Sequence, residues 1–340
     1  MADDAGRPPA AAGRTHASGA RFGRNRGARV RAALMNAGQR GAALLMAMAI
    51  MAVAAVAATA MLVALSTWSR QAGLAADHVQ AEELVTAGGD WARAMLFDDR
   101  RASGDVDHAG EPWALRLPPI PFENGELAGH IEDQQGRFNL NNLVRNGKLD
   151  VTQYARFQRL LAILGLPAEL ADALADWVDA DSVAQPAGGA EDAYYRGLGH
   201  PRLAANRPLV DLDELGFVRG FDASVRARLA PFVTALPAAT ALNVNTASAE
   251  VLAAVVDGLD LDSARALVAR RNGTFYRNSA DFLGQLGKDA TVPGQDIRVG
   301  SDYFLVTLRV TYGKTQARSQ LLLARTDAAR WPGVVWRKLR

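Results

Sequence analysis

Six carboxylates with no lysine or arginine among them are concentrated between residues 172 and 192. They are Asp172, Asp176, Asp179, Asp181, Glu191 and Asp192. Asp176 and Asp179 are one helical turn apart, so they share a face near the end of a predicted helix. Carboxylates at that end oppose the helix dipole, and a bound cation would relieve their repulsion.

Calcium is the ion that suits this stretch best, because Ca²⁺ takes six to eight hard oxygen ligands and tolerates flexible loops. The stretch is not an EF-hand, since no glycine stands at the sixth position after Asp179 and Glu191 falls one residue late. The residues alone favour the simpler alternative, a solvated acidic surface with no bound ion.

Other chemistry has little support in the sequence. Cysteine is absent, which excludes disulfides, thiolate zinc sites and cysteine nucleophiles. No G-x-S-x-G, H-E-x-x-H, P-loop or dinucleotide motif occurs, and the five histidines lack ligand spacing. We therefore expect that the protein is not an enzyme. A calcium-dependent enzyme is a weaker alternative, because the sequence shows no set of catalytic residues for it.

The segment 243–271 resembles the helix-hairpin-helix of DNA-binding proteins, with two predicted helices, 249–256 and 264–271, joined by the turn 257–262. A membrane-tethered DNA-binding or uptake protein is thus an alternative function. Three carboxylates in the turn would repel a phosphate backbone, however. We expect a packing module and no nucleic-acid partner.

A membrane-spanning helix is predicted from Ala42 to Leu65, a run of 24 uncharged residues interrupted only by Thr59. Such a helix is about 36 Å long at ~1.5 Å per residue, which exceeds the ~30 Å hydrocarbon core. The first 41 residues contain eight arginines and two aspartates. Positive charge stays on the cytoplasmic side, so we expect the N-terminus to be cytoplasmic and the C-terminal body to lie on the opposite side of the membrane.

A cleaved signal peptide is the alternative, with A-x-A sites at residues 55–57 and 58–60. Either cut would leave the apolar remnant 61–65 on a soluble protein. The run also exceeds the usual ~7–15-residue signal core. We favour a retained anchor.

Downstream, the pattern predicts that the helix continues to Asp98, with Leu74, Val85, Trp91 and Met95 on one apolar stripe and a bend at Gly88-Gly89. Strands are predicted at 113–117 and 127–133, and a hairpin at 303–312 and 315–325. The chain between about 151 and 285 has helical periodicity. The expected fold class is α+β: an antiparallel sheet interrupted by an inserted all-helical domain.

The expected organisation has five parts. Residues 1–41 form a basic leader, 42–65 the transmembrane helix, and 66–135 the long helix with the first strands. Residues 136–290 form the inserted helical domain with the acidic stretch, and 291–340 the last strands and a tail.

Gly41, followed by the apolar helix and preceded by the short basic segment Met35–Gly41, resembles the processing site of type IV prepilins and pseudopilins. The resemblance implies that a prepilin peptidase cuts after Gly41 and that Ala42 becomes the methylated N-terminus. Met35 is then the expected true start, and residues 1–34 are an upstream extension or a disordered tail.

Most pilin-like subunits carry glutamate at the fifth mature position, where this chain has Met46. Its absence, with a body too bulky for a repeating shaft, resembles the K-type minor pseudopilins of type II secretion. The family's markers follow in order at 136–141, 175–181, 189–195 and 242–247.

The resemblance implies an assembly role: a subunit that caps the periplasmic pseudopilus with I- and J-type minor pseudopilins, helps to initiate it, and so supports export of folded proteins. It implies a single-pass inner-membrane protein that meets the prepilin peptidase and the inner-membrane secretion platform. It also implies Ca²⁺ in the acidic stretch, with ligands Asp179, Asp181, Glu191 and Asp192.

Overall fold

The computed structural model describes residues 26–116 and 118–339, with side chains from residue 41 onward. The chain divides into two compact units, Met1–Ala72 and Gly73–Arg340. Residues 1–25 of the expected leader, and the side chains of residues 26–40, lie outside what is described.

Helix α1 (Arg26–Ser103) contains the predicted apolar run, and every side chain from Gly41 to Leu65 is exposed. An 18-residue window within it has a mean hydropathy of 2.5, and among the described residues this is the one helix long and apolar enough to cross a membrane. The Thr59 hydroxyl donates to the carbonyl of Ala55 at 2.8 Å, which satisfies it within the helix. These features fit a single-pass anchor.

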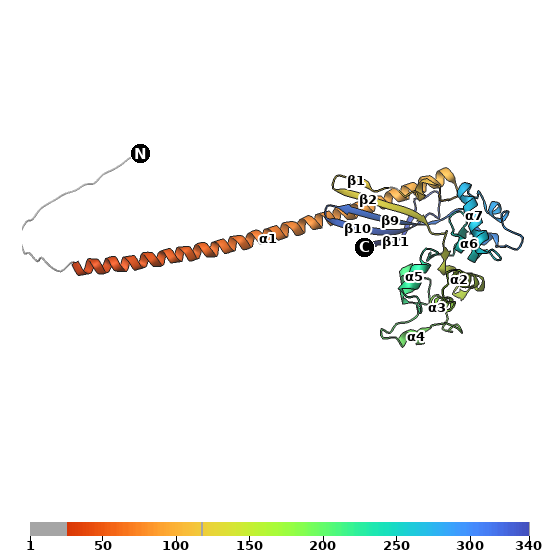
Figure 1. Cartoon of the computed structure of the whole chain (residues 1–340), viewed down its shortest axis with the longest axis horizontal. Coiled ribbons are helices and arrows are strands. Elements are labelled where there is room, and N and C mark those ends of the chain that lie inside the picture. Colours follow the sequence, from red (N-terminus) through yellow and green to blue (C-terminus); the bar gives the residue numbers. More distant parts are fainter. Residues whose placement is uncertain (1–25, 117, 340) are drawn as a thin grey trace, which may run out of the picture. The chain divides into compact units, whose positions relative to one another are not determined.

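The second unit is built around a five-stranded antiparallel sheet in the order β1-β2-β9-β10-β11 (Figure 1). The strands are β1 (Ile120–Phe122), β2 (Gly125–Asp133), β9 (Tyr303–Tyr312), β10 (Thr315–Ala324) and β11 (Gly333–Leu339). The predicted hairpin is thus confirmed as β9–β10, whereas β1 and β11 were not anticipated. Gly313 takes a φ of +53° in the hairpin turn, a conformation that suits glycine.

The strand predicted at 113–117 is wrong. Residues Pro112–Ala114 form a 3-10 helix, η1, instead. Proline presets a turn there, and the buried indole of Trp113 donates to the Glu111 carboxylate at 2.8 Å, which holds the ring inward.

The C-terminal part of α1 runs along one face of the sheet (Figure 1). Its buried stripe differs from the predicted one, because Leu74 and Trp91 are about half exposed. The helix contributes small side chains to that core, which it shares with the sheet; the buried ones are Ala81, Val85, Ala92 and Leu96.

At Gly88-Gly89, where the sequence predicts a bend, α1 continues as a helix through both residues. The two glycines serve close packing. A Cβ on Gly89 would lie 3.1 Å from a methyl carbon of Leu321, and one on Gly88 would lie 3.3 Å from Leu308. Helix and sheet therefore approach most closely where no side chain intervenes.

The chain between β2 and β9 is mainly helical and has its own core. Its helices are α2 (Val151–Ile163), α3 (Glu169–Val178), α4 (Asp192–Arg196), α5 (Ala223–Leu229), α6 (Ala249–Val255), α7 (Leu261–Gly273) and α8 (Ser279–Leu283). The 3-10 helices are η2 (Leu140–Leu143), η3 (Leu212–Phe217) and η4 (Gly294–Asp296).

The expectation of an all-helical segment is wrong in one respect, because short strands pair within it. They are β3 (Phe138–Asn139) with β6 (Val233–Thr234), β4 (Val144–Arg145) with β5 (Lys148–Leu149), and β7 (Leu242–Asn243) with β8 (Ile297–Arg298). These pairs join segments up to about a hundred residues apart.

Asparagine side chains hold this part together from within. The amide of buried Asn141 donates to the carbonyls of Leu209 and Leu236 at 2.9 and 2.8 Å, while its oxygen accepts from the Leu209 N–H at 2.8 Å. Asn245 exchanges two bonds with the backbone of Tyr276 at 2.9 and 2.8 Å. The asparagines of the sequence markers therefore tie distant loops together.

Candidate metal centre

The acidic stretch lies at the end of α3, a helix buried along almost its whole length. Asp179 ends the helix in extended backbone geometry (φ −77°, ψ 172°). The following loop folds back tightly, because a Cβ on Gly189 would lie 2.4 Å from both a carboxylate oxygen of Asp176 and the N–H nitrogen of Gln185. The loop thereby brings Glu191, at the start of α4, back to the end of α3.

Four of the six carboxylates have protein partners, and the exposed one, Asp181, accepts from the Val183 N–H at 2.8 Å. Asp172 accepts from the Tyr154 hydroxyl, and Asp176 accepts from the Gln185 N–H at 3.1 and 3.2 Å. Asp192 pairs with Arg196 at 2.8 Å and accepts from the Ala204 N–H at 3.0 Å. The structure thus does not bring Asp192 into the group with the other expected ligands, because both of its oxygens hold neighbouring backbone and side chain.

The other three expected ligands do come together. Asp179, Asp181 and Glu191 each offer an oxygen, and these oxygens lie within 4.8 Å of one another. Asp179 and Glu191 are buried, with 2% and 7% of their surface exposed. One oxygen of Asp179 and both oxygens of Glu191 have no hydrogen-bond partner among the described residues. Buried carboxylates without a partner are costly, so this geometry fits a cation.

The electrostatics agree with the geometry. Burial, followed by the nearby carboxylates of Asp181 and Asp176, raises the pKa of Asp179 to about 6. Burial and three neighbouring carboxylates raise the pKa of Glu191 to about 7. Both shifts express the difficulty of holding negative charge here without a counter-ion, and a divalent cation would reverse them.

A second acidic group has a different character. Asp99, Asp107 and Glu111 also place oxygens within 4.8 Å of one another. Arg325 occupies this group, with guanidinium nitrogens on Asp99 and Asp107, and Glu111 accepts from the Trp113 indole. A protein cation already neutralises these carboxylates, so the site at Asp179 is the candidate for a metal.

The helix-hairpin-helix segment is closed to a phosphate backbone. Its turn glycine, Gly258, has a φ of +74°, and a Cβ there would lie 2.1 Å from the carbonyl oxygen of Asp289. The turn also forms a β-bridge between Asp257 and Thr291. Arg159 adds to this closure, since it pairs with Asp257 at 2.7 Å. The alternative of DNA binding is therefore not favoured.

A long helix with an apolar N-terminal part that fits a membrane anchor, and a polar C-terminal part packed onto an antiparallel sheet, is the arrangement of the pilin-like class of proteins. Residues 136–238 and 242–299 match two family models, both described as type II secretion system (T2SS), protein K. The chain belongs to the type II secretion system protein K family of minor pseudopilins.

Curated relatives agree along most of the chain. A type II secretion system protein K of Pseudomonas aeruginosa is 37% identical over 301 residues, covering 85% of this chain and 89% of the relative. The protein of the same name from Klebsiella pneumoniae is 35% identical over 321 residues, covering 89% and 97%. A chain from the GspK-GspI-GspJ complex of enterotoxigenic Escherichia coli superposes with a TM-score of 0.68 at 26% identity, over 77% of this chain and 96% of that one.

Proposed function

We propose that this protein caps the periplasmic pseudopilus of type II secretion and helps to initiate it, and so supports the export of folded proteins across the outer membrane. The observation that carries the proposal is the family relationship, in which a similar solved chain lies in a complex with GspI and GspJ. By that analogy, I- and J-type minor pseudopilins are the partners of this chain.

The anchor helix supports the placement at a filament end. At its fifth position after Gly41 the helix presents Met46, where an acidic residue would neutralise a neighbouring N-terminus in the bilayer. At a filament end with no following neighbour there is no N-terminal amine to neutralise, so a subunit there does not need the acidic residue. The mainly helical residues 136–290, proposed as an inserted domain, would form the bulky tip.

Processing at Gly41 is part of the same proposal. Among the residues whose side chains are described, none lies within 4 Å of the position a Cβ would take on Gly41. A prepilin peptidase would cut after Gly41, and Ala42 would carry the methylated amine. The chain would then stay in the inner membrane with its N-terminus cytoplasmic and its body periplasmic, until the secretion platform draws it into the filament.

Calcium at the acidic centre completes the proposal. Asp179, Asp181 and Glu191 would hold the ion, which would neutralise buried charge that none of the described groups pairs. Asp192 would serve indirectly, by pairing with Arg196 within α4 and by holding the Ala204 N–H against the start of that helix. The ion would join the end of α3 to the start of α4 and so stabilise the intervening loop.

Co-purification tests the central claim. The full chain, expressed with the I- and J-type pseudopilins of the same organism and solubilised from membranes, should elute with both in one complex. Mass spectrometry of the same sample should find a methylated alanine corresponding to Ala42. Separate elution of the three proteins would overturn the assembly role, and a first residue after Ala57 or Ala60 would overturn the retained anchor.

A further inference from the structure

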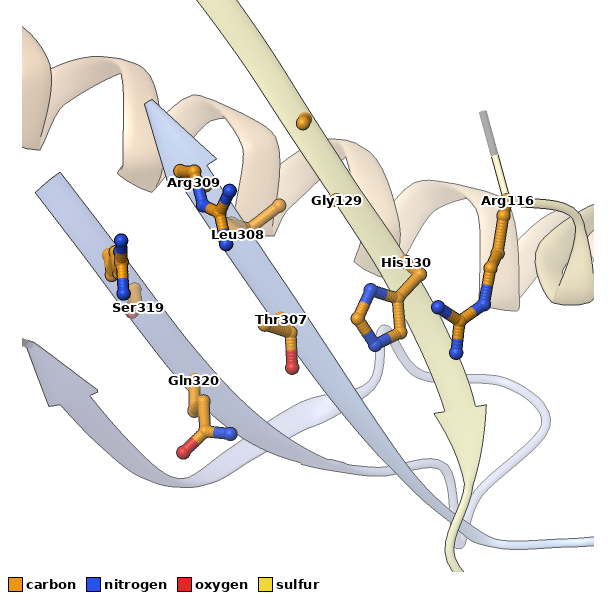
Figure 2. Close-up of a pocket in the computed structure, with 10 residues that line it drawn as sticks. Arg116, Gly129, His130, Thr307, Leu308, Arg309, Ser319 and Gln320 are labelled. Carbon is orange, nitrogen blue, oxygen red and sulfur yellow. The ribbon is translucent and has the colours of Figure 1, made fainter. Parts of the chain in front are cut away.

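The face of the sheet that α1 leaves uncovered carries an unusual arrangement of charge. Side chains alternate along β2, β9 and β10, and one row across this face consists of Ala128, Arg309 and Arg318, which are direct neighbours in the strand register. The next row has Thr307 between His130 and Gln320. Figure 2 shows His130, Thr307, Arg309 and Gln320 on these neighbouring strands, with Arg116 beside them. With Ala128 and Arg318 they line an open hollow of about 480 Å³.

Arg309 and Arg318 face each other in the β9–β10 ladder, and both are exposed. Like charges directly opposite on neighbouring strands destabilise the pair. Neither guanidinium has a carboxylate within 4.0 Å in the part of the chain that the structure describes. The fold therefore tolerates two adjacent positive charges that no described carboxylate within 4.0 Å neutralises.

Other charges on this face are accounted for. Glu132 lies 3.6 Å from Arg116, 3.6 Å from His130 and 3.1 Å from Arg137, so one carboxylate contacts two arginines and a histidine. Lys338, opposite Gln320 on β11, pairs with Asp211 at 3.0 Å. Glu126 lies in the row beyond Arg309, opposite Thr311, and forms no ion pair with either arginine.

We propose that this surface, here called the arginine face and made of Arg116, Arg309 and Arg318 above Thr307 and Gln320, binds a carboxylate-rich peptide segment of a partner protein. Guanidinium groups bind carboxylates in a bidentate way, and the hydroxyl and amide of the floor supply neutral hydrogen bonds. The hollow is larger than one small anion needs. Glu126 and Glu132 flank it on both sides, which restricts the ligand to a short acidic segment and disfavours a continuous phosphate backbone.

A peptide-binding titration tests the proposal on the full chain in nanodiscs of neutral phosphatidylcholine. The probe is fluorescein-labelled hexaglutamate, followed by fluorescence anisotropy at low salt. We expect saturable binding that weakens at least tenfold in the double variant R309Q/R318Q. The matched control, R277Q/R330Q, removes two exposed arginines elsewhere and should bind as the unchanged chain does. The arginine-rich first 41 residues are present in every sample, so only the difference between variants counts.

Charge reversal sharpens the test. The double variant R309E/R318E should lose hexaglutamate binding and gain hexalysine binding. Thermal melting checks that the other double variant, R309Q/R318Q, is folded. Its midpoint should be no lower than that of the unchanged chain, because a repulsive pair has been removed. Equal hexaglutamate affinity in the unchanged chain and R309Q/R318Q would overturn the proposal. So would competition by inorganic phosphate as strong as that by hexaglutamate, or tighter binding of a twelve-residue oligothymidylate, which would indicate an anion site or a nucleic-acid face.

Discussion

Arg325 and Asp107 form an ion pair that is closed to solvent, with 1% and 0% of their surfaces exposed. The same guanidinium contacts Asp99 at 2.9 Å and lies 4.6 Å above the ring centre of Phe304. The second oxygen of Asp107 accepts from the Ser301 N–H at 2.7 Å. One arginine at the end of β10 thus joins the end of α1 to the loops that lead into β1 and β9.

Asn243 extends this joint toward the helical segment. Its amide donates to the Asp107 carbonyl at 3.1 Å, to Asp133 at 2.9 Å and to the Ser301 hydroxyl at 3.0 Å. Burial raises the pKa of Asp133, and the Thr246 hydroxyl and the Asn243 amide oppose that shift. The network connects both ends of the segment between β2 and β9 to the sheet.

We predict that Arg325→Gln lowers the free energy of unfolding by about 3–5 kcal/mol, because it leaves Asp107 buried without its counter-charge. Chemical denaturation of the full chain in detergent measures the change. Arg318→Gln, an exposed position on the same strand, is the control and should stay within about 0.5 kcal/mol of the unchanged chain. Equal stability of the two variants would contradict the role of the ion pair.

Calcium should stabilise the protein through the acidic centre. At free Ca²⁺ one hundredfold above its dissociation constant, the gain is about 2.7 kcal/mol, which raises the melting midpoint. The double variant Asp179→Asn/Glu191→Gln should lose this response and should be more stable than the unchanged chain in chelator, because the repulsion is gone. Asp192→Asn should retain the response. If the chain without substitutions melts at the same midpoint with and without chelator, the proposal of a bound metal is contradicted.

Without metal, stability should fall as the pH rises from about 4 to about 7. The folded-state pKa values of Asp179 and Glu191, about 6 and about 7, lie above the ordinary values of 3.8 and 4.5. In this window the folded state binds more protons than the unfolded state, so raising the pH favours unfolding. Melting in chelator across this range measures the effect, and the Asp179→Asn/Glu191→Gln variant should show a weaker slope. Because Ca²⁺ requires the ionised carboxylates, its stabilising effect should increase over the same range.

Substitutions at two glycines of α1 should change the stability of the protein in opposite directions. Gly89→Val should destabilise the protein by about 1–3 kcal/mol, since even a Cβ would lie 3.1 Å from Leu321 in the packed core. Gly73→Ala should stabilise it by up to about 1 kcal/mol, because among the described residues no group outside its own helix backbone lies within 4 Å of the added Cβ, and alanine favours the helix. Thermal melting compares them, and a change of the same sign in both variants would contradict the packing account.

Met46→Glu tests why the anchor helix lacks an acid. A carboxylate at this position would offer a partner to the N-terminal amine of a following subunit, so we expect the variant to appear inside filaments as well as at their ends. Cross-linking to the I- and J-type pseudopilins, followed by mass spectrometry, measures its neighbours. Met46→Leu is the control. An unchanged capped complex with Met46→Glu would refute this explanation of the position.

The sequence by itself determined the features whose signals lie within a few residues of one another. The uncharged run 42–65 indicated the anchor, since its length and composition match a bilayer. The alternation along 303–312, the turn at Gly313 and the return at 315 indicated the hairpin, with the correct bounds to within one residue at the end of β10. The six carboxylates indicated the acidic centre and three of its expected members.

Only the tertiary structure decided which groups share a site or a core. Asp192 lies outside the acidic group, because its two carboxylate oxygens accept hydrogen bonds from Arg196 and from the N–H of Ala204, which is twelve residues away. Arg325 gave no sequence signal, because its partners Asp99 and Asp107 lie more than two hundred residues earlier in the chain. The repulsion between Arg309 and Arg318 likewise depends on strand register. The local sequence pattern indicates helices and strands through their periodicity. Burial and charge pairing depend on contacts that form only when segments distant in the sequence pack together.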